Sequence, residues 1–172
     1  MRRVVVGVTG SLGSLAALHR AAAEARVRDA ELRVVLAWQS PGGELGSRNG
    51  LSPSALAECR TAAVERLREV LGTAFRAAKP GVTLTGLTVR GTPPGAALVD
   101  TARGVEDHLV VGTGSRTPMR RLLRPSVACY CVAHAACPVL VVPPSPRRTS
   151  STRRTDATAT WFRQISSRGV RT

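Results

Sequence analysis

Residues 109–126 read LVVGTGSRTPMRRLLRPS, and this stretch decides the fold. Residues 109–111 form a continuous apolar run, which is typical of a parallel strand covered on both faces. Gly112 and Gly114 then predict a sharp turn that leaves backbone amides uncovered. Ser126 follows as a natural N-cap for the helix predicted by VACYCVAHAA. A helix start that faces a glycine turn is a place where a phosphate group can bind.

Strand patterns alternate with helix patterns along the whole chain. We expect five strands, at residues 3–8, 32–38, 82–89, 108–112 and 138–142. We expect helices to begin near Ser11, Pro53, Gly95 and Ser126, the second of them ending at residues 79–81. Two buried stripes are predicted, one in the first helix (Leu12, Leu15, Leu18, Ala22, Ala25) and one in the second (Leu56, Cys59, Ala63, Leu67, Val70, Ala74, Ala78). Right-handed crossovers then favour an α/β fold, a Rossmann-like three-layer sandwich around a parallel sheet.

The deciding stretch, with the CPVLVVP at residues 137–143, resembles the C-terminal signature of the universal stress protein family. That family has a Gly, two residues, a second Gly, nine residues and then Gly-Ser or Gly-Thr, and holds the phosphates of ATP with this pattern. This sequence keeps Gly112 and Ser126 but has Ser115 and Pro125 at the other two glycine positions. The start VGVTGS is similar to the family's VGVDGS, with Thr9 in place of the aspartate near the adenine and ribose.

The resemblance covers residues 2–143 and implies strand order 3-2-1-4-5 in a universal stress protein domain at residues 1–143. In that order the turn at residues 9–13 faces the loop at residues 112–126 across a crevice, the place where open α/β sheets bind ligands. The candidate nucleotide-binding residues are Thr9, Gly10, Ser11, Ala37, Gly112, Thr113, Gly114, Ser115, Arg116, Ser126 and Val127.

The three departures predict a degenerate ATP site. Pro125 has no amide for a phosphate oxygen, and a positive φ at Ser115 would cost roughly 1–2 kcal/mol. We therefore expect a stress-response or signalling module that binds ATP weakly or not at all. The alternative is an ATP-binding stress protein whose phosphates lie at residues 112–116 and Ser126. We expect no enzymatic activity, because His19, His108 and His134 lack the spacing to a nucleophile that a hydrolase requires.

The last predicted strand is an edge strand, because prolines bracket it. Val139, Leu140, Val141 and Val142 are consecutive apolar residues without a charged neighbour, and such an edge tends to pair with another chain. Antiparallel pairing with a second copy would remove both exposed edges. The family resemblance also implies a homodimer through this strand.

The formal net charge of +14 raises nucleic-acid binding as a second alternative. Residues 144–172 hold seven arginines and one aspartate and lack hydrophobic periodicity, so we expect a disordered basic tail. Trp161 and Phe162 are its aromatic residues. The charge also fits an arginine-rich coding bias, and nucleic acid is therefore not the expected partner.

The four cysteines are expected as free thiols of a cytoplasmic protein. Cys129, Cys131, His134 and Cys137 do not have the paired spacing of a zinc site, so no metal is expected. No run reaches the roughly 20 apolar residues of a membrane span, and the N-terminus does not have the pattern of a signal peptide.

Overall fold

The computed structural model describes residues 2–39, 52–90, 93–113 and 126–144. Five strands and four helices are described, in the order β1 (Arg3–Gly7), α1 (Leu12–Arg28), β2 (Glu31–Trp38), α3 (Pro53–Ala74), β3 (Leu84–Arg90), α4 (Pro94–Thr101), β4 (His108–Gly112), α6 (Val127–His134) and β5 (Val139–Val142). Gly114, Ser115, Arg116, Pro125 and the tail expected at residues 144–172 lie outside the described residues, except Pro144 itself.

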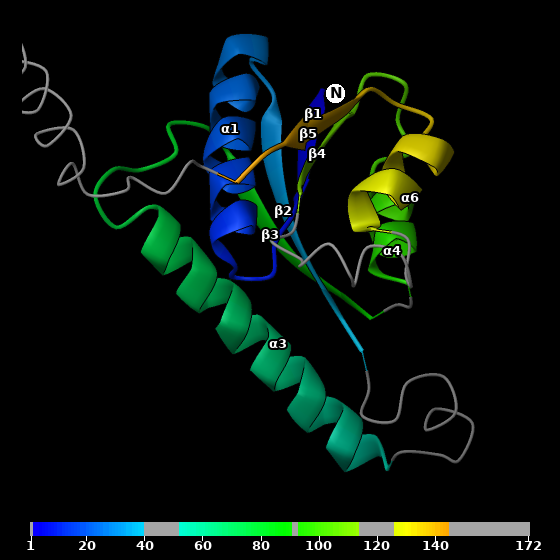
Figure 1. The fold of residues 1–172 in the computed structure, drawn as a ribbon. Coiled ribbons are helices and arrows are strands. Elements are labelled where there is room, and N and C mark those ends of the chain that lie inside the picture. The colour runs from blue at the N-terminus through cyan, green and yellow to red at the C-terminus, as the bar shows by residue number, and fades with distance from the viewer. Residues whose placement is uncertain (1, 40–51, 91–92, 114–125, 145–172) are drawn as a thin grey trace, which may run out of the picture.

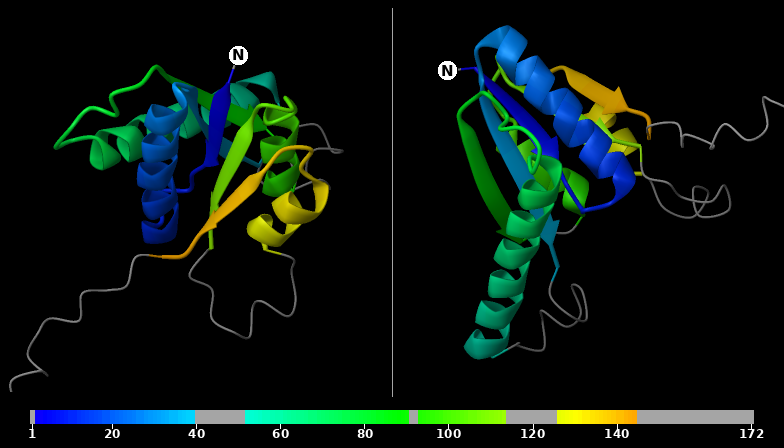
Figure 2. Two further views of the ribbon diagram at one scale, coloured as in Figure 1. Left: turned by 90° about the horizontal axis from the view of Figure 1, so that it is seen from above. Right: turned by 90° about the vertical axis from the view of Figure 1, so that its left-hand side faces the viewer.

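The strands form one parallel sheet in the order β3-β2-β1-β4-β5, which confirms the predicted fold. Strand β1 lies at the centre, where Val5 pairs with Arg33 of β2 on one side and with Leu109 of β4 on the other. Helices α1 and α3 cover one face of the sheet and α4 and α6 cover the other (Figures 1 and 2). The structure is therefore the three-layer sandwich that the alternating pattern predicts.

The core is built from small aliphatic side chains on both faces of β1. Val4 and Val6 face α1, whereas Val5 faces α4 and α6, and all three are fully buried. Ala17, Ala21, Ala22 and Ala25 form the buried surface of α1 together with Leu18. Alanine lets the helix approach the sheet closely, which suits a chain with 3% aromatic residues.

The first turn of α1 differs from the predicted stripe. Leu12 is 73% exposed, whereas Gly13 and Ser14 are buried. The small residues face the end of β4. A Cβ placed on Gly13 would lie 3.1 Å from the Thr113 carbonyl oxygen, a tight contact that leaves little room for a side chain. Leu12 consequently points to solvent.

Helix α3 ends at Ala74, earlier than the end predicted at residues 79–81, and Ala78 is exposed. The chain turns at Phe75, whose ring meets His19 edge-on with ring centroids 5.9 Å apart. Only Ala63, Leu67 and Val70 of the predicted stripe are buried. Strand β3 likewise begins at Leu84, two residues later than predicted, after Gly81 with φ 71°.

Candidate functional site

The turn between β1 and α1 is the first wall of the candidate site. Gly10 has φ 81°, a conformation that favours glycine. The Thr9 hydroxyl donates to the Ser11 hydroxyl oxygen at 3.1 Å, and the Ser11 oxygen accepts from the Ser14 amide at 3.3 Å as the N-cap of α1. The Thr9 amide donates to the Ser14 hydroxyl oxygen at 3.3 Å. The turn is thus held by its own polar groups, with Thr9 and Ser11 at the surface.

The carboxyl end of β4 is the second wall, and it touches the first. A Cβ placed on Gly112 would lie 2.6 Å from the Gly13 carbonyl oxygen, closer than side chains tolerate. The Thr113 amide continues the sheet by donating to the Val142 carbonyl oxygen at 2.9 Å. The structure therefore brings the turn at residues 9–13 against Gly112 and Thr113, as the strand order predicts.

The other described candidates lie on separate elements. Ala37 is half-buried near the carboxyl end of β2, opposite Val89 of β3. Ser126 caps α6 by accepting from the Cys129 amide at 3.1 Å, and Val127 is the first residue of that helix. The N-cap role predicted for Ser126 is present.

Arg66 of α3 lies against this turn, a position that the sequence did not predict. Its guanidinium carbon lies 2.9 Å, and its Nε 3.2 Å, from the position that a Cβ on Gly10 would take. A side chain at residue 10 would displace the Arg66 guanidinium, and the positive φ of Gly10 favours glycine there. The sequence offers only one indirect signal, which is that Arg66 directly precedes Leu67 of the buried stripe.

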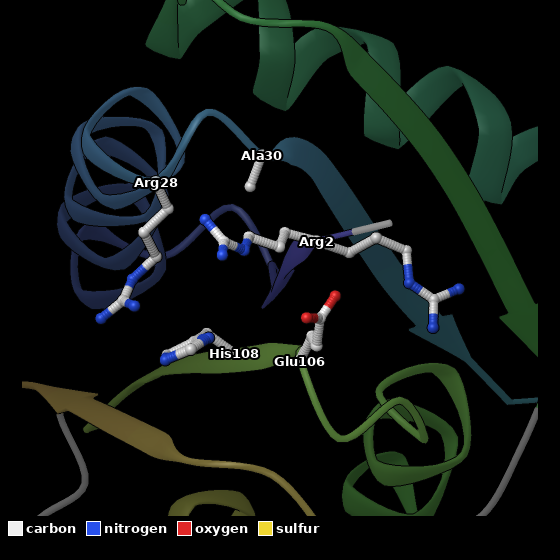
Figure 3. Close-up of a pocket in the computed structure, with 6 residues that line it drawn as sticks. Arg2, Arg28, Ala30, Glu106 and His108 are labelled. Atoms are coloured by element: carbon white, nitrogen blue, oxygen red, sulfur yellow. The ribbon is translucent and has the colours of Figure 1, made fainter.

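A cavity of about 350 Å³ lies at the opposite, amino edge of the sheet (Figure 3). Its lining residues are Arg2, Arg3, Arg28, Ala30, Glu106 and His108. Arg3 donates two hydrogen bonds to the buried Asp107, at 2.8 and 2.6 Å, and the Glu106 carboxylate stands in the same wall. The cavity therefore combines charges of both signs and lies away from the glycine turns, at the edge where the strands begin.

Burial governs the chemistry of two of the four cysteines. It raises the pKa of the Cys131 thiol to about 11, with the nearby Cys137 adding to the effect, and it raises the pKa of Cys137 as well. Both thiols are therefore protonated at neutral pH and pack as small apolar groups in the core below α6. Cys129 is exposed and Cys59 is half-buried.

The His134 ring stacks on Tyr130, with centroids 4.2 Å apart, and its Nδ1 lies 2.9 Å from the Tyr130 carbonyl oxygen. In the part of the chain that the structure describes, no group of three or more His, Cys, Asp or Glu side chains could hold a metal ion. None of the described helices is long and apolar enough to cross a membrane.

The sequence matches the model of the universal stress protein family over residues 1–143, so the chain belongs to that family. A comparison with curated proteins gave no match. Several solved structures match this chain.

One similar structure is a universal stress protein in complex with cAMP, with 30% identity, coverage of 84% of this chain and 98% of that one, and a TM-score of 0.62. A family member from Burkholderia pseudomallei is 28% identical, with coverage of 82% and 95% and a TM-score of 0.57. The universal stress protein from Archaeoglobus fulgidus in complex with dAMP is 26% identical, with coverage of 83% and 98% and a TM-score of 0.56.

Proposed function

We propose that this chain is a stress-response module that binds adenine nucleotides weakly at the crevice between β1 and β4, and that it is not an enzyme. The observation that carries the proposal is the direct contact of the turn at residues 9–13 with Gly112 and Thr113. That contact lies at the point where the strand order reverses, which is where open α/β sheets bind ligands. Two similar family members are solved with cAMP and with dAMP.

The weakness follows from three side chains. Thr9 supplies a hydroxyl, already bonded to Ser11, where the family has a carboxylate for the nucleoside. Ser115 and Pro125, which lie outside the described residues, replace two glycines of the phosphate-binding pattern. At each of these three positions we expect the loss of a contact that the family pattern provides to the nucleotide, without a replacement.

The absence of enzymatic activity is supported by the described nucleophiles and bases. The buried Cys131 and Cys137 are protonated, because burial raises their pKa values. His19, His108 and His134 lie on three different elements, α1, β4 and α6. Incubation of the protein with ATP and chromatography of the nucleotide is the check, and turnover that disappears in Ser126→Ala would contradict this part of the proposal.

Titration calorimetry with ATP tests the weakened site. We expect weak or undetectable binding by the unaltered chain and at least tenfold stronger binding by the triple variant Thr9→Asp, Ser115→Gly, Pro125→Gly. A triple variant with Thr9→Val in place of Thr9→Asp is the matched control, since it restores the glycines alone. Tight ATP binding by the unaltered chain, with no gain in the triple variant, would show that the departures do not weaken the site.

We further propose that the chain forms a homodimer through β5. Strand β5 is at the edge of the sheet, and Leu140 on it is 36% exposed. Val139 and Val141 pack against the core below α6, so a charge at either position would also disturb folding. Leu140→Lys is therefore the better variant.

Light scattering should show a dimer for the unaltered chain and a monomer for Leu140→Lys. Val132→Lys is the matched control. Val132 is also an exposed apolar residue, but it lies on α6, so this variant should leave the dimer intact. A monomer at all concentrations in the unaltered chain would refute the dimer.

A further inference from the structure

The cavity at the amino edge of the sheet collects basic side chains from three separate elements (Figure 3). Arg2 directly precedes β1, Arg28 is the last residue of α1, and His108 is the first residue of β4. Val4 belongs to the core below α1 and pairs with His108. Side chains alternate along a strand, so Arg2 and His108 lie on the face of the sheet that α1 covers, where Arg28 ends the helix.

Acidic groups neutralise only part of this charge. Arg3, the third arginine of the lining, donates hydrogen bonds of 2.8 and 2.6 Å to Asp107, so the charges of these two residues compensate each other. Glu106 is the one carboxylate among the described residues that line the cavity. Basic groups therefore outnumber acidic groups in the lining.

Arg28 is held only weakly by its own helix. Its Nε lies 3.5 Å from the Glu24 carboxylate, which binds Arg20 more closely, at 2.7 Å. The Arg28 side chain is 41% exposed, and an exposed pair of this kind contributes about 0–1 kcal/mol. An anion in the cavity can compete with such a contact.

The end of α1 is capped by backbone amides and not by Arg28. Asp29 takes a left-handed conformation with φ 48°, and its amide donates to the Arg26 carbonyl oxygen at 3.4 Å. The Ala30 amide donates to the Ala25 carbonyl oxygen at 3.0 Å. This arrangement is common at helix C-termini and satisfies the two carbonyl groups. The Arg28 guanidinium is therefore not required for capping them.

The three basic groups suit a phosphate monoester. Such a group presents three acceptor oxygens and nearly two negative charges at neutral pH. Two guanidinium groups match this charge, and an imidazole N–H can donate to a third oxygen. A carboxylate has a single charge and two oxygens, which one arginine can satisfy. The cavity volume of about 350 Å³ is also within the range of small-molecule sites, so it has room for an organic group beside the phosphate.

We propose that this cavity is a second ligand site, which binds a small phosphate monoester through Arg2, Arg28 and His108. Ala30 is the one apolar residue among the described lining residues, and it can contact the organic part of the ligand. The site lies where the strands begin, at the opposite end of the sheet from the proposed nucleotide site. It therefore does not depend on nucleotide binding.

The test is a nuclear magnetic resonance titration of the ¹⁵N-labelled chain with glycerol phosphate at constant ionic strength. Glycerol is the neutral control ligand. The amides of Ala30 and Leu109 report on the cavity, whereas those of Gly10 and Thr113 report on the crevice at the carboxyl edge. Thermal unfolding of each variant verifies that the fold is intact.

We expect saturable shifts at the cavity amides with glycerol phosphate and none with glycerol. Arg2→Gln and Arg28→Gln should each weaken binding by about five- to tenfold, the usual effect of losing a charged hydrogen bond. Arg68→Gln is the matched control, because it removes the same charge from an exposed position on α3, and it should change binding by less than twofold. Glu106→Gln should strengthen binding at least twofold, since it removes a negative charge from the cavity wall.

Four outcomes would overturn the inference. Equal weakening by Arg28→Gln and Arg68→Gln would mean that the net charge of the chain attracts the anion without a built site. Shifts confined to Gly10 and Thr113 would place the phosphate in the crevice at the carboxyl edge. Absence of saturable shifts at millimolar glycerol phosphate would show that the cavity binds no phosphate monoester. Binding of a phosphoserine peptide at least tenfold more tightly at the cavity amides would assign the site to a phosphorylated protein.

Discussion

The amino and carboxyl ends of the parallel strands, called here the amino edge and the carboxyl edge of the sheet, are stabilised by different kinds of interaction. At the amino edge, a buried carboxylate, Asp107, receives two hydrogen bonds from Arg3 and one from the Gly104 amide. At the carboxyl edge, the contact between Gly13 and Gly112 is backbone against backbone. An ion pair with a buried carboxylate stabilises the edge where the strands begin, and close packing of glycine backbones stabilises the edge where the nucleotide site is proposed.

The largest expected effect is the loss of the charged network at the amino edge. Asp107 is 1% exposed and Arg3 is 26% exposed, so Asp107→Asn leaves a guanidinium without its partner. We expect the free energy of unfolding to fall by about 2–3 kcal/mol, less than for a fully buried pair because water can reach Arg3. Urea denaturation measures it.

Asp100→Asn is the matched control for that change. Asp100 pairs with Arg103 at 2.7 Å, but the side chains are 61% and 74% exposed. Exposed pairs contribute little, so the control should cost less than about 1 kcal/mol. Equal losses in the two variants would contradict the structural role of the amino edge.

The next effect concerns the carboxyl edge. In Gly112→Ala the new methyl group would lie 2.6 Å from the Gly13 carbonyl oxygen and 3.0 Å from its carbon. Backbone cannot yield as a flexible side chain does, and we expect a loss of about 2 kcal/mol in the free energy of unfolding. Nucleotide binding should weaken too, because the two walls must move apart.

Gly72→Ala is the control for the glycine at the carboxyl edge. Gly72 lies in α3 with nothing within 4 Å of an added Cβ. Alanine favours helix more than glycine does, so this variant should be more stable by roughly 0.5–1 kcal/mol. The opposite signs of the two glycine changes would show that Gly112 is required for close approach and not for flexibility.

A smaller effect is expected at the N-cap of α6. Ser126→Ala removes the acceptor for the Cys129 amide, now at 3.1 Å, and should cost about 1 kcal/mol of stability in urea denaturation. Ser126→Asp keeps a cap and should restore most of that loss. If the aspartate variant is as unstable as the alanine variant, capping is not the role of this side chain.

The sequence is sufficient to predict the sheet and to bring the two glycine segments together, because alternating buried strands and helices leave few right-handed arrangements. The sequence does not predict the residue at which α3 ends or the position of Arg66. Hydrophobic periodicity identifies the buried face of a helix but not its last residue. Helix α3 ends before Phe75, which packs edge-on against His19. The contact of the exposed Arg66 with Gly10 joins residues that are far apart in the sequence, so no local sequence pattern predicts it.

The smallest expected effect is the pH dependence of the amino edge. Burial by itself would raise the pKa of Asp107, but the hydrogen bonds from Arg3 and the Gly104 amide outweigh it and hold this pKa below its usual value. A lowered pKa stabilises the fold above the unfolded pKa of about 3.9, and this contribution disappears as the pH falls through the folded value.

The stability difference between the unaltered chain and Asp107→Asn should therefore be constant from pH 7 to about pH 5 and narrow below about pH 4. Glu31 also has a lowered pKa, through a hydrogen bond from Thr85 and then through Arg33. It loses its contribution in both proteins alike, so it cancels from the difference. Urea denaturation of the pair at several pH values measures the gap. A difference in the free energy of unfolding that stays constant down to pH 3 would mean that Asp107→Asn destabilises the fold through altered packing and not through loss of the charge. The amino edge would then be stabilised by close packing, as the carboxyl edge is.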